Sequence, residues 1–155
     1  MSVAYIALGS NLGDKAANLG QAVKLLQAKG LQIRAVSSFF QTEPYGVTDQ
    51  PEFINAAACV ETSLPPEALL KLLLETELEM GRVRLRHWGE RNIDLDLLLY
   101  DDLIYHSDKL TLPHPDMQNR LFVLQPLAEV AAEKIHPVYK KSIQTLLKSL
   151  TDGDE

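Results

Sequence analysis

The sequence predicts an α+β fold, and three observations support this prediction. Apolar runs of strand length recur along the chain, two segments with helical spacing of apolar residues lie between them, and Gly and Pro mark the turns. The resulting order is β, α, β, β, α, β, which is the ferredoxin-like, split βαβ plan, an antiparallel sheet with helices packed on it. We expect an irregular C-terminal extension after this core and one domain over residues 1–155.

The first half of the chain supplies three of the strands and one helix. Val3 to Leu8 is an apolar run that predicts a buried strand, ended by the turn sequence GSNLGD. Asn18 to Lys29 has apolar residues at helical spacing, and Leu31 to Ser37 returns as a strand. After a loop rich in Pro, Gly and polar residues at 41–52, Phe53 to Thr62 predicts the next strand.

The second half completes the plan and adds the extension. Glu67 to Met80 predicts a helix, and Ile93 to Leu99 predicts an apolar strand after a basic loop. We expect a hairpin around Asp101-Asp102, a strand over Phe122 to Leu127, and a last amphipathic helix near Ser142 to Leu150.

Composition and net charge indicate which classes of partner the chain can bind. Its 46% apolar and 23% charged residues are those of a soluble globular protein. The net charge of −6 argues against a nucleic-acid partner, because such binding depends on excess Lys and Arg. The one cysteine, Cys59, permits no disulfide within the chain, and we expect it to be a buried apolar residue. The N-terminal apolar run is too short for a signal or membrane segment, so we expect a cytoplasmic protein without a membrane partner. We also expect a monomer.

Two carboxylates, Asp94 and Asp96, interrupt the apolar strand in the second half of the chain. Residues two apart share a strand face and lie about 6.6 Å apart along it. At about 6 Å and an effective dielectric constant near 20, two such charges repel by roughly 3 kcal/mol. Either nearby arginines or Mg²⁺ can neutralise the pair, and the spacing leaves both open. The same alternation places these apolar residues on the opposite face: Ile93, Leu95, Leu97 and Leu99.

A basic loop precedes this strand. Its arginines are Arg82, Arg84, Arg86 and Arg91. Taken alone, the loop is a solvated charge run at a helix C-terminus, where cations are favoured by the helix dipole. Beside two carboxylates, it also suits a phosphate site, because guanidinium groups match phosphate oxygens and neutralise charge that develops during transfer.

Other polar residues have two interpretations as well. GSNLGD lacks the Gly-Lys-Ser/Thr ending of a phosphate loop, so we interpret it as a strand-to-helix turn. Asn55 lies in an apolar run, where a buried amide needs partners; a planar heterocycle would supply them, and Phe53 and Phe122 could stack on it. His114 and Arg120 suit either a phosphate contact or a structural role, and the histidine spacing gives no zinc site.

Together these segments resemble the 6-hydroxymethyl-7,8-dihydropterin pyrophosphokinase family of folate biosynthesis. The segments that match are GSNLGD, TEPYG, QPEFINAA, GRVR, HWGERNIDLDLL and PHPDMQNR. The resemblance implies a ferredoxin-like fold and an ATP-dependent diphosphotransferase. It implies attack by the pterin's hydroxymethyl oxygen at the β-phosphorus of ATP, assisted by two Mg²⁺ ions, with release of AMP.

The resemblance also implies roles for individual residues. Asp94 and Asp96 would bind both Mg²⁺ ions, Arg82 and Arg91 would complete the catalytic set, and Glu77 would support the centre from its helix. The implied ATP site consists of Arg82, Arg84, Trp88, Arg91, Leu97, Leu110, Thr111, His114 and Arg120. The implied pterin site consists of Thr42, Tyr45, Phe53, Asn55 and Phe122.

Two leucines fit this assignment less well, and two other functions compete with it. Leu85 stands in the basic loop, where a polar residue is expected, and Leu74 offers no polar side chain to the adenine pocket. One competitor is a non-catalytic binding module in which the arginines and aspartates simply pair. The other is a nucleotide-dependent transferase with a different acceptor, which would not need Asn55.

Overall fold

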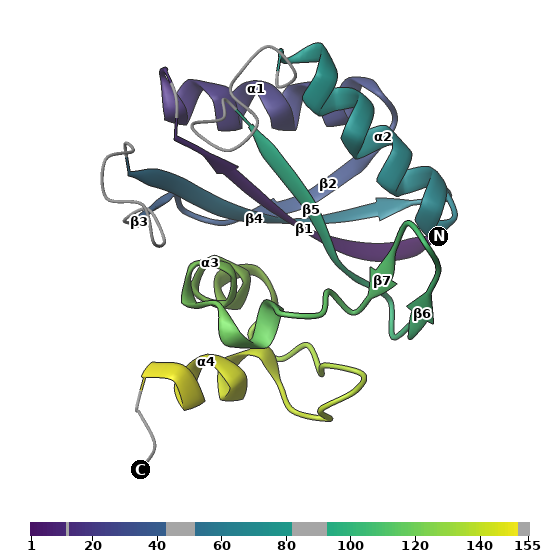
Figure 1. Ribbon diagram of the computed structural model, residues 1–155, viewed down its shortest axis with the longest axis vertical. Helices are drawn as coiled ribbons and strands as arrows, with labels where there is room; N and C mark the ends of the chain where they lie inside the picture. The colour runs from purple at the N-terminus through teal and green to yellow at the C-terminus, as the bar shows by residue number, and fades with distance from the viewer. Residues whose placement is uncertain (12, 43–51, 82–92, 152–155) are drawn as a thin grey trace.

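An antiparallel sheet lies between two helical layers (Figure 1). The structure is a computed structural model that describes residues 1–11, 13–42, 52–81 and 93–151. One face of the sheet is covered by α1 (Lys15–Ala28) and α2 (Pro66–Glu79). The other face is covered by α3 (Leu121–Ala131), and α4 (Ile143–Thr151) packs against α3. In the described residues, no helix has the length and apolar character that a membrane span requires.

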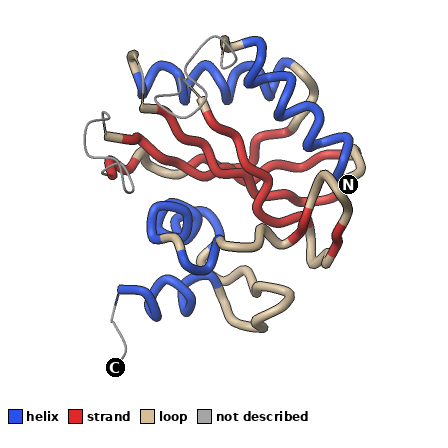
Figure 2. The backbone as a smooth tube through the Cα atoms, in the orientation of Figure 1, coloured by secondary structure: helices blue, strands red, loops and turns tan. Residues whose placement is uncertain are grey.

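The sheet, whose strands are red in Figure 2, has the ferredoxin-like strand order, which confirms the predicted fold. Its main path runs β2 (Gln32–Val36), β4 (Phe53–Thr62), β1 (Ser2–Ser10), β5 (Asp94–Tyr100), with every pairing antiparallel. A short strand, β3 (Phe40–Thr42), pairs with β4 beyond β2. Strand β5 is thus an edge strand: β1 pairs with one of its sides, and its other side is open to other elements.

Local sequence explains where the first two helices begin and which face they bury. The side chain of Asp14 caps α1 by accepting a hydrogen bond from the Ala17 N–H at 3.2 Å. Helix α2 begins at Pro66, a position where the missing N–H of proline costs nothing. The residues that these two helices bury recur at helical spacing: Leu19, Ala22 and Leu26 in α1, and Leu69, Leu73, Thr76 and Glu77 in α2.

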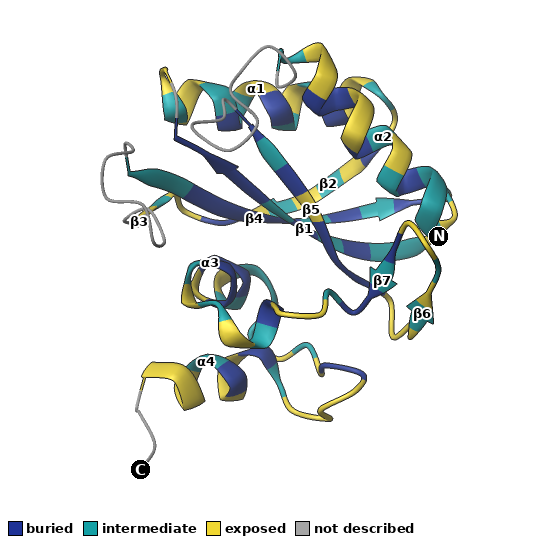
Figure 3. Ribbon diagram, viewed as in Figure 1, coloured by how far each residue is buried: buried dark blue, intermediate teal, exposed yellow. Residues whose placement is uncertain are grey.

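Two apolar layers hold the sheet, one on each face (Figure 3). Alternate residues of the central strands supply the layer under α1 and α2, including Ile6, Leu8 and Val60. The opposite layer forms between the sheet and α3, with Ala57 from β4 and Leu124 from α3. Both faces of the sheet are therefore covered, which explains why its central strands are apolar runs rather than alternating ones.

A β-bulge in β5 changes one predicted strand face. Tyr5 of β1 is opposite Leu99, and the next residue, Ile6, is opposite Leu97, so Leu98 is the extra residue. Leu95 and Leu97 share one face as predicted, and this face packs against α2, but Leu99 joins Leu98 in the layer under α3. The predicted placement of Leu99 was wrong because simple alternation does not continue through a bulge.

The predicted strand over residues 122–127 was also wrong, because this segment is part of α3. A short apolar run does not distinguish a buried strand from a buried helix by periodicity alone. Val123, Leu124 and Leu127 form the face that packs on the sheet, and Pro126 lies inside the helix, where proline is rare.

The hairpin predicted at Asp101-Asp102 is a turn without a hairpin. The Leu103 N–H donates to the Tyr100 carbonyl at 3.0 Å, as in a turn, but the chain beyond does not pair with β5. Instead β6 (Tyr105–His106) pairs with β7 (Thr111–Leu112). Asp101 continues the pairing with β1, because its N–H donates to the Val3 carbonyl and its carboxylate accepts from the Val3 N–H.

We predict that His136, between α3 and α4, makes the fold less stable in mild acid. Its ring is buried, Nδ1 accepts from the Val138 and Tyr139 N–H groups at 3.2 Å, and burial lowers its pKa below 6.5. The unfolded chain therefore takes up the proton first, so the stability is fully present above the unfolded value and is lost as the pH falls below it. Urea unfolding of the wild type and of His136→Gln at pH values of about 7.5 and about 5.5 measures this loss.

The His136→Gln variant should show a smaller difference in unfolding free energy between the two pH values than the wild type does. His106→Gln is the matched control, because His106 is exposed, and it should keep the wild-type difference. An undiminished difference in His136→Gln would contradict the prediction.

Candidate active site

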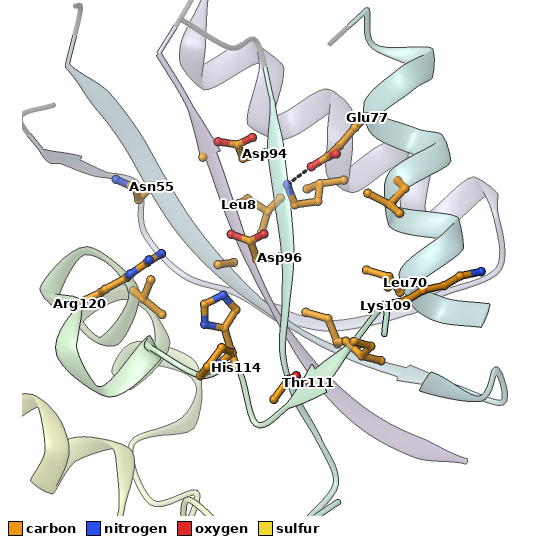
Figure 4. A pocket seen from close by; sticks show the side chains of 18 of the residues that line it. Leu8, Asn55, Leu70, Glu77, Asp94, Asp96, Lys109, Thr111, His114 and Arg120 are labelled. Atoms are coloured by element: carbon orange, nitrogen blue, oxygen red, sulfur yellow. Dashed lines mark hydrogen bonds between the residues drawn. The ribbon is translucent and has the colours of Figure 1, made fainter. Parts of the chain in front are cut away.

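A cavity of about 680 Å³ lies along the open edge of β5 (Figure 4). Residues of α2, among them Leu70 and Glu77, line it on one side of the strand. Arg120 and Phe122, at the start of α3, line it on the other side. Because the cavity borders both sides of an edge strand, β5 can present residues from both of its faces to one ligand.

Asp94 and Asp96 lie on the face of β5 that points toward α3. Their partners on β1 are Gly9 and Ala7, and these small residues leave room beside the carboxylates. Figure 4 shows both carboxylates on the side of the strand where Asn55 also lies. Asp94 is half-buried and Asp96 is exposed, and both line the cavity. Their shared face agrees with the alternation expected from the sequence.

The chemistry of this pair suits Mg²⁺ held jointly with a phosphate ligand. Carboxylate oxygens are hard ligands, and Mg²⁺ typically uses one or two of them together with substrate phosphates and water. Within residues 1–11, 13–42, 52–81 and 93–151, no group of three or more His, Cys, Asp or Glu side chains could hold a metal ion by itself. Two carboxylates on one strand face fit an Mg²⁺ ion whose other ligands are substrate phosphates and water.

Glu77 of α2 fixes the open edge of β5. Its side chain is buried, and Oε2 accepts a hydrogen bond from the Leu95 N–H at 2.7 Å (Figure 4). An edge strand exposes backbone donors that need partners, and here a helix side chain provides one. This contact holds Leu95 in place between the two aspartates.

His114 connects the other end of the cavity to β5. The backbone N–H of His114 donates to the Leu98 carbonyl at 2.9 Å, and the side-chain Nδ1 accepts from the Asp116 N–H at 3.3 Å. Burial lowers the pKa of His114, and this effect outweighs the opposing charge of Asp96. The neutral ring therefore carries its proton on Nε2, which leaves an N–H that can donate to an anionic ligand.

Arg120 adds a positive charge near His114. Its guanidinium carbon lies 5.9 Å from the centroid of the Phe122 ring, and its Nη2 lies 3.7 Å from a carboxylate oxygen of Asp116. Stacking on an aromatic face orients a guanidinium group without removing its donors. Arg120 and His114 thus offer N–H donors on the side of the cavity that faces Asp96.

The β6–β7 hairpin forms the end of the cavity that contains Leu110 and Thr111. Glu67 of α2 anchors it, because its Oε2 accepts from the Ser107 hydroxyl at 2.6 Å and from the Tyr105 hydroxyl at 2.5 Å. The Ser107 hydrogen bond, followed by that of Tyr105, lowers the pKa of Glu67. The apolar Leu110 therefore has a fixed position beside the cavity.

The cavity brings together every predicted site residue whose side chain the structure describes. These residues are Phe53, Asn55, Asp94, Asp96, Leu97, Leu110, Thr111, His114, Arg120 and Phe122. Glu77, which the sequence placed near the metal centre, and Leu74, which it placed at the adenine pocket, also line it. Their placement leaves the role of each residue a prediction.

The remaining predicted residues lie outside the described part or are described only in backbone. Tyr45, Arg82, Arg84, Trp88 and Arg91 lie outside the described residues, as does Leu85. Thr42 is the last residue of β3, where it pairs with Phe53 of β4.

Sequence reasoning gave no role to several residues that line the cavity. They are Ala7, Leu8, Gly9, Leu70, Leu95, His106, Ser107, Asp108, Lys109, Pro115 and Val123. For Gly9, the signal was its place in GSNLGD, directly after an apolar run, but the motif was interpreted only as a turn.

The fold and the cavity define a ferredoxin-like α+β protein with carboxylate, imidazole and guanidinium groups at one sheet edge. Its sequence matches the model of the family described as 7,8-dihydro-6-hydroxymethylpterin-pyrophosphokinase over residues 5–132. The chain belongs to this family, and it is an ATP-dependent diphosphotransferase.

Two curated relatives support the same assignment, and both are named 2-amino-4-hydroxy-6-hydroxymethyldihydropteridine pyrophosphokinase. The relative from Haemophilus influenzae is 46% identical over 153 residues, which cover 98% of this chain and 95% of that protein. The relative from Bacillus subtilis is 47% identical over 133 residues, which cover 85% of this chain and 80% of that protein.

Solved structures support the fold. A crystal structure of Plasmodium falciparum HPPK-DHPS with pteroate superposes with a TM-score of 0.80 over 97% of this chain, at 15% sequence identity. This chain spans 44% of that longer chain. At such low identity the likeness shows the fold alone.

We predict that Glu77→Ala destabilises the protein, because it leaves the Leu95 N–H without its acceptor. A buried donor left unsatisfied costs about 1–3 kcal/mol of unfolding free energy, and Glu77→Gln should cost less because an amide oxygen can still accept. The matched control is Glu79→Ala in the same helix, which removes only an ion pair with Lys29 in which the Glu79 side chain is half exposed. Equal unfolding free energies of Glu77→Ala and Glu79→Ala in urea would contradict the role of Glu77.

Proposed function

We propose that this diphosphotransferase moves the terminal diphosphate of ATP to the hydroxymethyl group of 6-hydroxymethyl-7,8-dihydropterin and releases AMP, as a step of folate biosynthesis. The observation that carries the proposal is the composition of the cavity. The same cavity is lined by paired carboxylates, an imidazole and a guanidinium, and by a buried amide and two aromatic rings. The charged groups and the imidazole suit phosphates and their metal ions, and the amide and the rings suit a planar heterocycle.

The nucleotide end of the site is the end bounded by the β6–β7 hairpin. Leu97, Leu110 and Thr111 line this end and would contact the adenine, with the exposed Leu74 beside them. Leu74 cannot hydrogen-bond to the base, so its polar contacts would come from backbone groups. His114 and Arg120 would then donate to the phosphates, since they lie toward Asp96.

The acceptor end of the site is built on β4. Asn55 is a buried polar side chain that lines the cavity, and its amide has both donors and an acceptor, as the edge of a pterin ring does. Phe53 and Phe122 also line the cavity and would stack against the two faces of the ring. Thr42 and Tyr45 would complete the recognition of the ring.

Asp94 and Asp96 would hold two Mg²⁺ ions, which would supply charge neutralisation to the phosphates of ATP. Arg82 and Arg91 are proposed to bind the same phosphates, and Arg84 and Trp88 are proposed to contribute to ATP binding. This arrangement gives each charge its counterpart, because the carboxylates bind cations and the arginines bind phosphate oxygens. It also explains why both signs of charge occur together in the sequence from residue 82 to residue 96.

The reaction requires little covalent chemistry from the protein. The hydroxymethyl oxygen attacks the β-phosphorus in line, the bond from that phosphorus to the oxygen bridging to the α-phosphate breaks, and AMP leaves with the bridging oxygen. The hydroxyl proton is released to water. Positioning of both substrates and stabilisation of phosphate charge therefore account for catalysis.

Incubation of the protein with Mg²⁺, ATP and 6-hydroxymethyl-7,8-dihydropterin tests the proposal directly. We expect AMP to form in proportion to the pterin consumed, and chelation of Mg²⁺ to stop its formation. ADP as the product would indicate transfer of one phosphate, and turnover that does not depend on pterin would indicate another acceptor. Either result would contradict the proposal.

We predict that Asp96→Asn lowers the rate of AMP formation by about 100-fold or more, the scale of losing one electrostatic contact made in the transition state. The variant should stay folded, with an unfolding free energy close to that of the wild type in the absence of Mg²⁺, because Asp96 is exposed. Asp102→Asn serves as the control, since Asp102 is exposed and pairs with Lys134 outside the cavity.

The competing binding module makes the opposite prediction for the same variant. If Asp96 served only as an ion-pair partner, its removal would lower stability without changing turnover. A destabilised variant with near-normal AMP formation would therefore exclude the metal role of Asp96.

A further inference from the structure

Gly9 lies between the two ends of the proposed site, in one row of residues across three strands. It is opposite Asn55 on β4 and opposite Asp94 on β5. Residues that are directly opposite in antiparallel strands point to the same face of the sheet. All three residues line the cavity, and Figure 4 shows Asn55 and Asp94 on the same side of the sheet. Gly9 is therefore the middle position of a row whose two ends carry the predicted pterin and metal contacts.

The space above Gly9 is occupied by the amide of Asn55. A Cβ atom at position 9 would lie 2.9 Å from Asn55 Oδ1 and 3.8 Å from Cδ1 of Phe53. The first distance is shorter than Cβ atoms tolerate, whereas the second is an ordinary van der Waals contact. Gly9 is an interior residue of β1, paired on both sides, so the local need for glycine is the close approach of Asn55.

We propose that Gly9 is a positioning residue that sets the orientation of the Asn55 amide, and that it thereby determines recognition of the pterin acceptor. Because Gly9 has no side chain, the Asn55 carboxamide can lie directly above the central strand β1. Because neighbouring strands are about 4.8 Å apart, the row from Asn55 to Asp94 spans about 10 Å, which suits a fused bicyclic ring with a reactive substituent at its far end. This inference rests on the proposed function, since it takes the ligand of Asn55 to be the pterin.

A single methyl group tests this role. Gly9→Ala should displace Asn55 Oδ1, because the contact at 2.9 Å cannot persist. We expect the KM for the pterin to rise about tenfold, as for loss of a buried polar contact, while the KM for ATP changes by less than about twofold. Gly20→Ala in α1 is the matched control, because nothing lies within 4 Å of its added Cβ, and both of its KM values should equal those of the wild type.

A double-mutant cycle separates a role through Asn55 from a general disturbance of β1. Asn55→Ala removes the atom that the new Cβ would meet, so Gly9→Ala should add little loss in that background. If the increase in pterin KM in the double variant equalled the product of the two single-variant increases, Gly9 would act independently of Asn55, and the inference would be overturned. If Gly9→Ala alone folds poorly, the double variant should recover the stability of Asn55→Ala in urea unfolding, and failure to recover would count equally against it.

The same variants distinguish failure of this inference from failure of the proposed function. A raised pterin KM in Asn55→Ala with an unchanged KM in Gly9→Ala would overturn the role of Gly9 and leave the proposed function intact. An unchanged pterin KM in Asn55→Ala would overturn the assigned role of Asn55 and this inference together.

If no pterin-dependent AMP formed at all, the side-chain amide NMR signal of Asn55 would still decide whether Gly9 positions it. That signal should shift in Gly9→Ala and not in Gly20→Ala, and an unshifted signal would overturn the positioning role.

Discussion

The open edge of β5 is the constraint on which the candidate site depends. A strand at the edge of a sheet has backbone groups that β1 cannot satisfy, and two other elements supply partners for them: Glu77 accepts from the Leu95 N–H, and the His114 N–H donates to the Leu98 carbonyl. The Glu77 contact holds α2 on one side of the strand. The His114 contact holds the segment that leads into α3 on the other side. The cavity exists because both elements are held beside an edge that no further strand of the described residues covers.

The same constraint explains how two carboxylates are placed in an apolar strand. The Leu95 and Leu97 side chains are buried against α2, while Asp94 and Asp96 point to the other face beside the small residues Gly9 and Ala7. Apolar burial thus fixes the backbone, and the backbone fixes the spacing of the charges. The proposed chemistry uses this rigidity, since phosphoryl transfer is catalysed by positioning and electrostatics rather than by covalent participation of the protein.

Most of the fold could be predicted from the sequence, because its periodic segments are long and bounded by Gly and Pro. Strand β4 has the predicted limits of Phe53 and Thr62, and helix α2 differs by one residue at each end. The errors at α3 and at Leu99 have one cause: tertiary packing decides the conformation of a short apolar run and the position of a bulge. For the site, residue chemistry and family motifs predicted the lining residues that carry polar or aromatic chemistry, such as Asn55, Asp96 and His114, but gave no role to others, such as Gly9 and Leu70. The contact between Gly9 and Asn55 could not be predicted, because it depends on register across strands.

Thermal unfolding in the presence of a non-hydrolysable ATP analogue tests the central claim most directly, namely that the β5 carboxylates act through a cation shared with phosphate. A ligand that binds only the folded state raises the unfolding temperature according to its affinity. The account predicts a rise when both the analogue and Mg²⁺ are present, a much smaller rise with EDTA, and loss of the Mg²⁺-dependent part in Asp94→Asn/Asp96→Asn. An equal rise with and without Mg²⁺, or an undiminished Mg²⁺-dependent rise in the double variant, would contradict it.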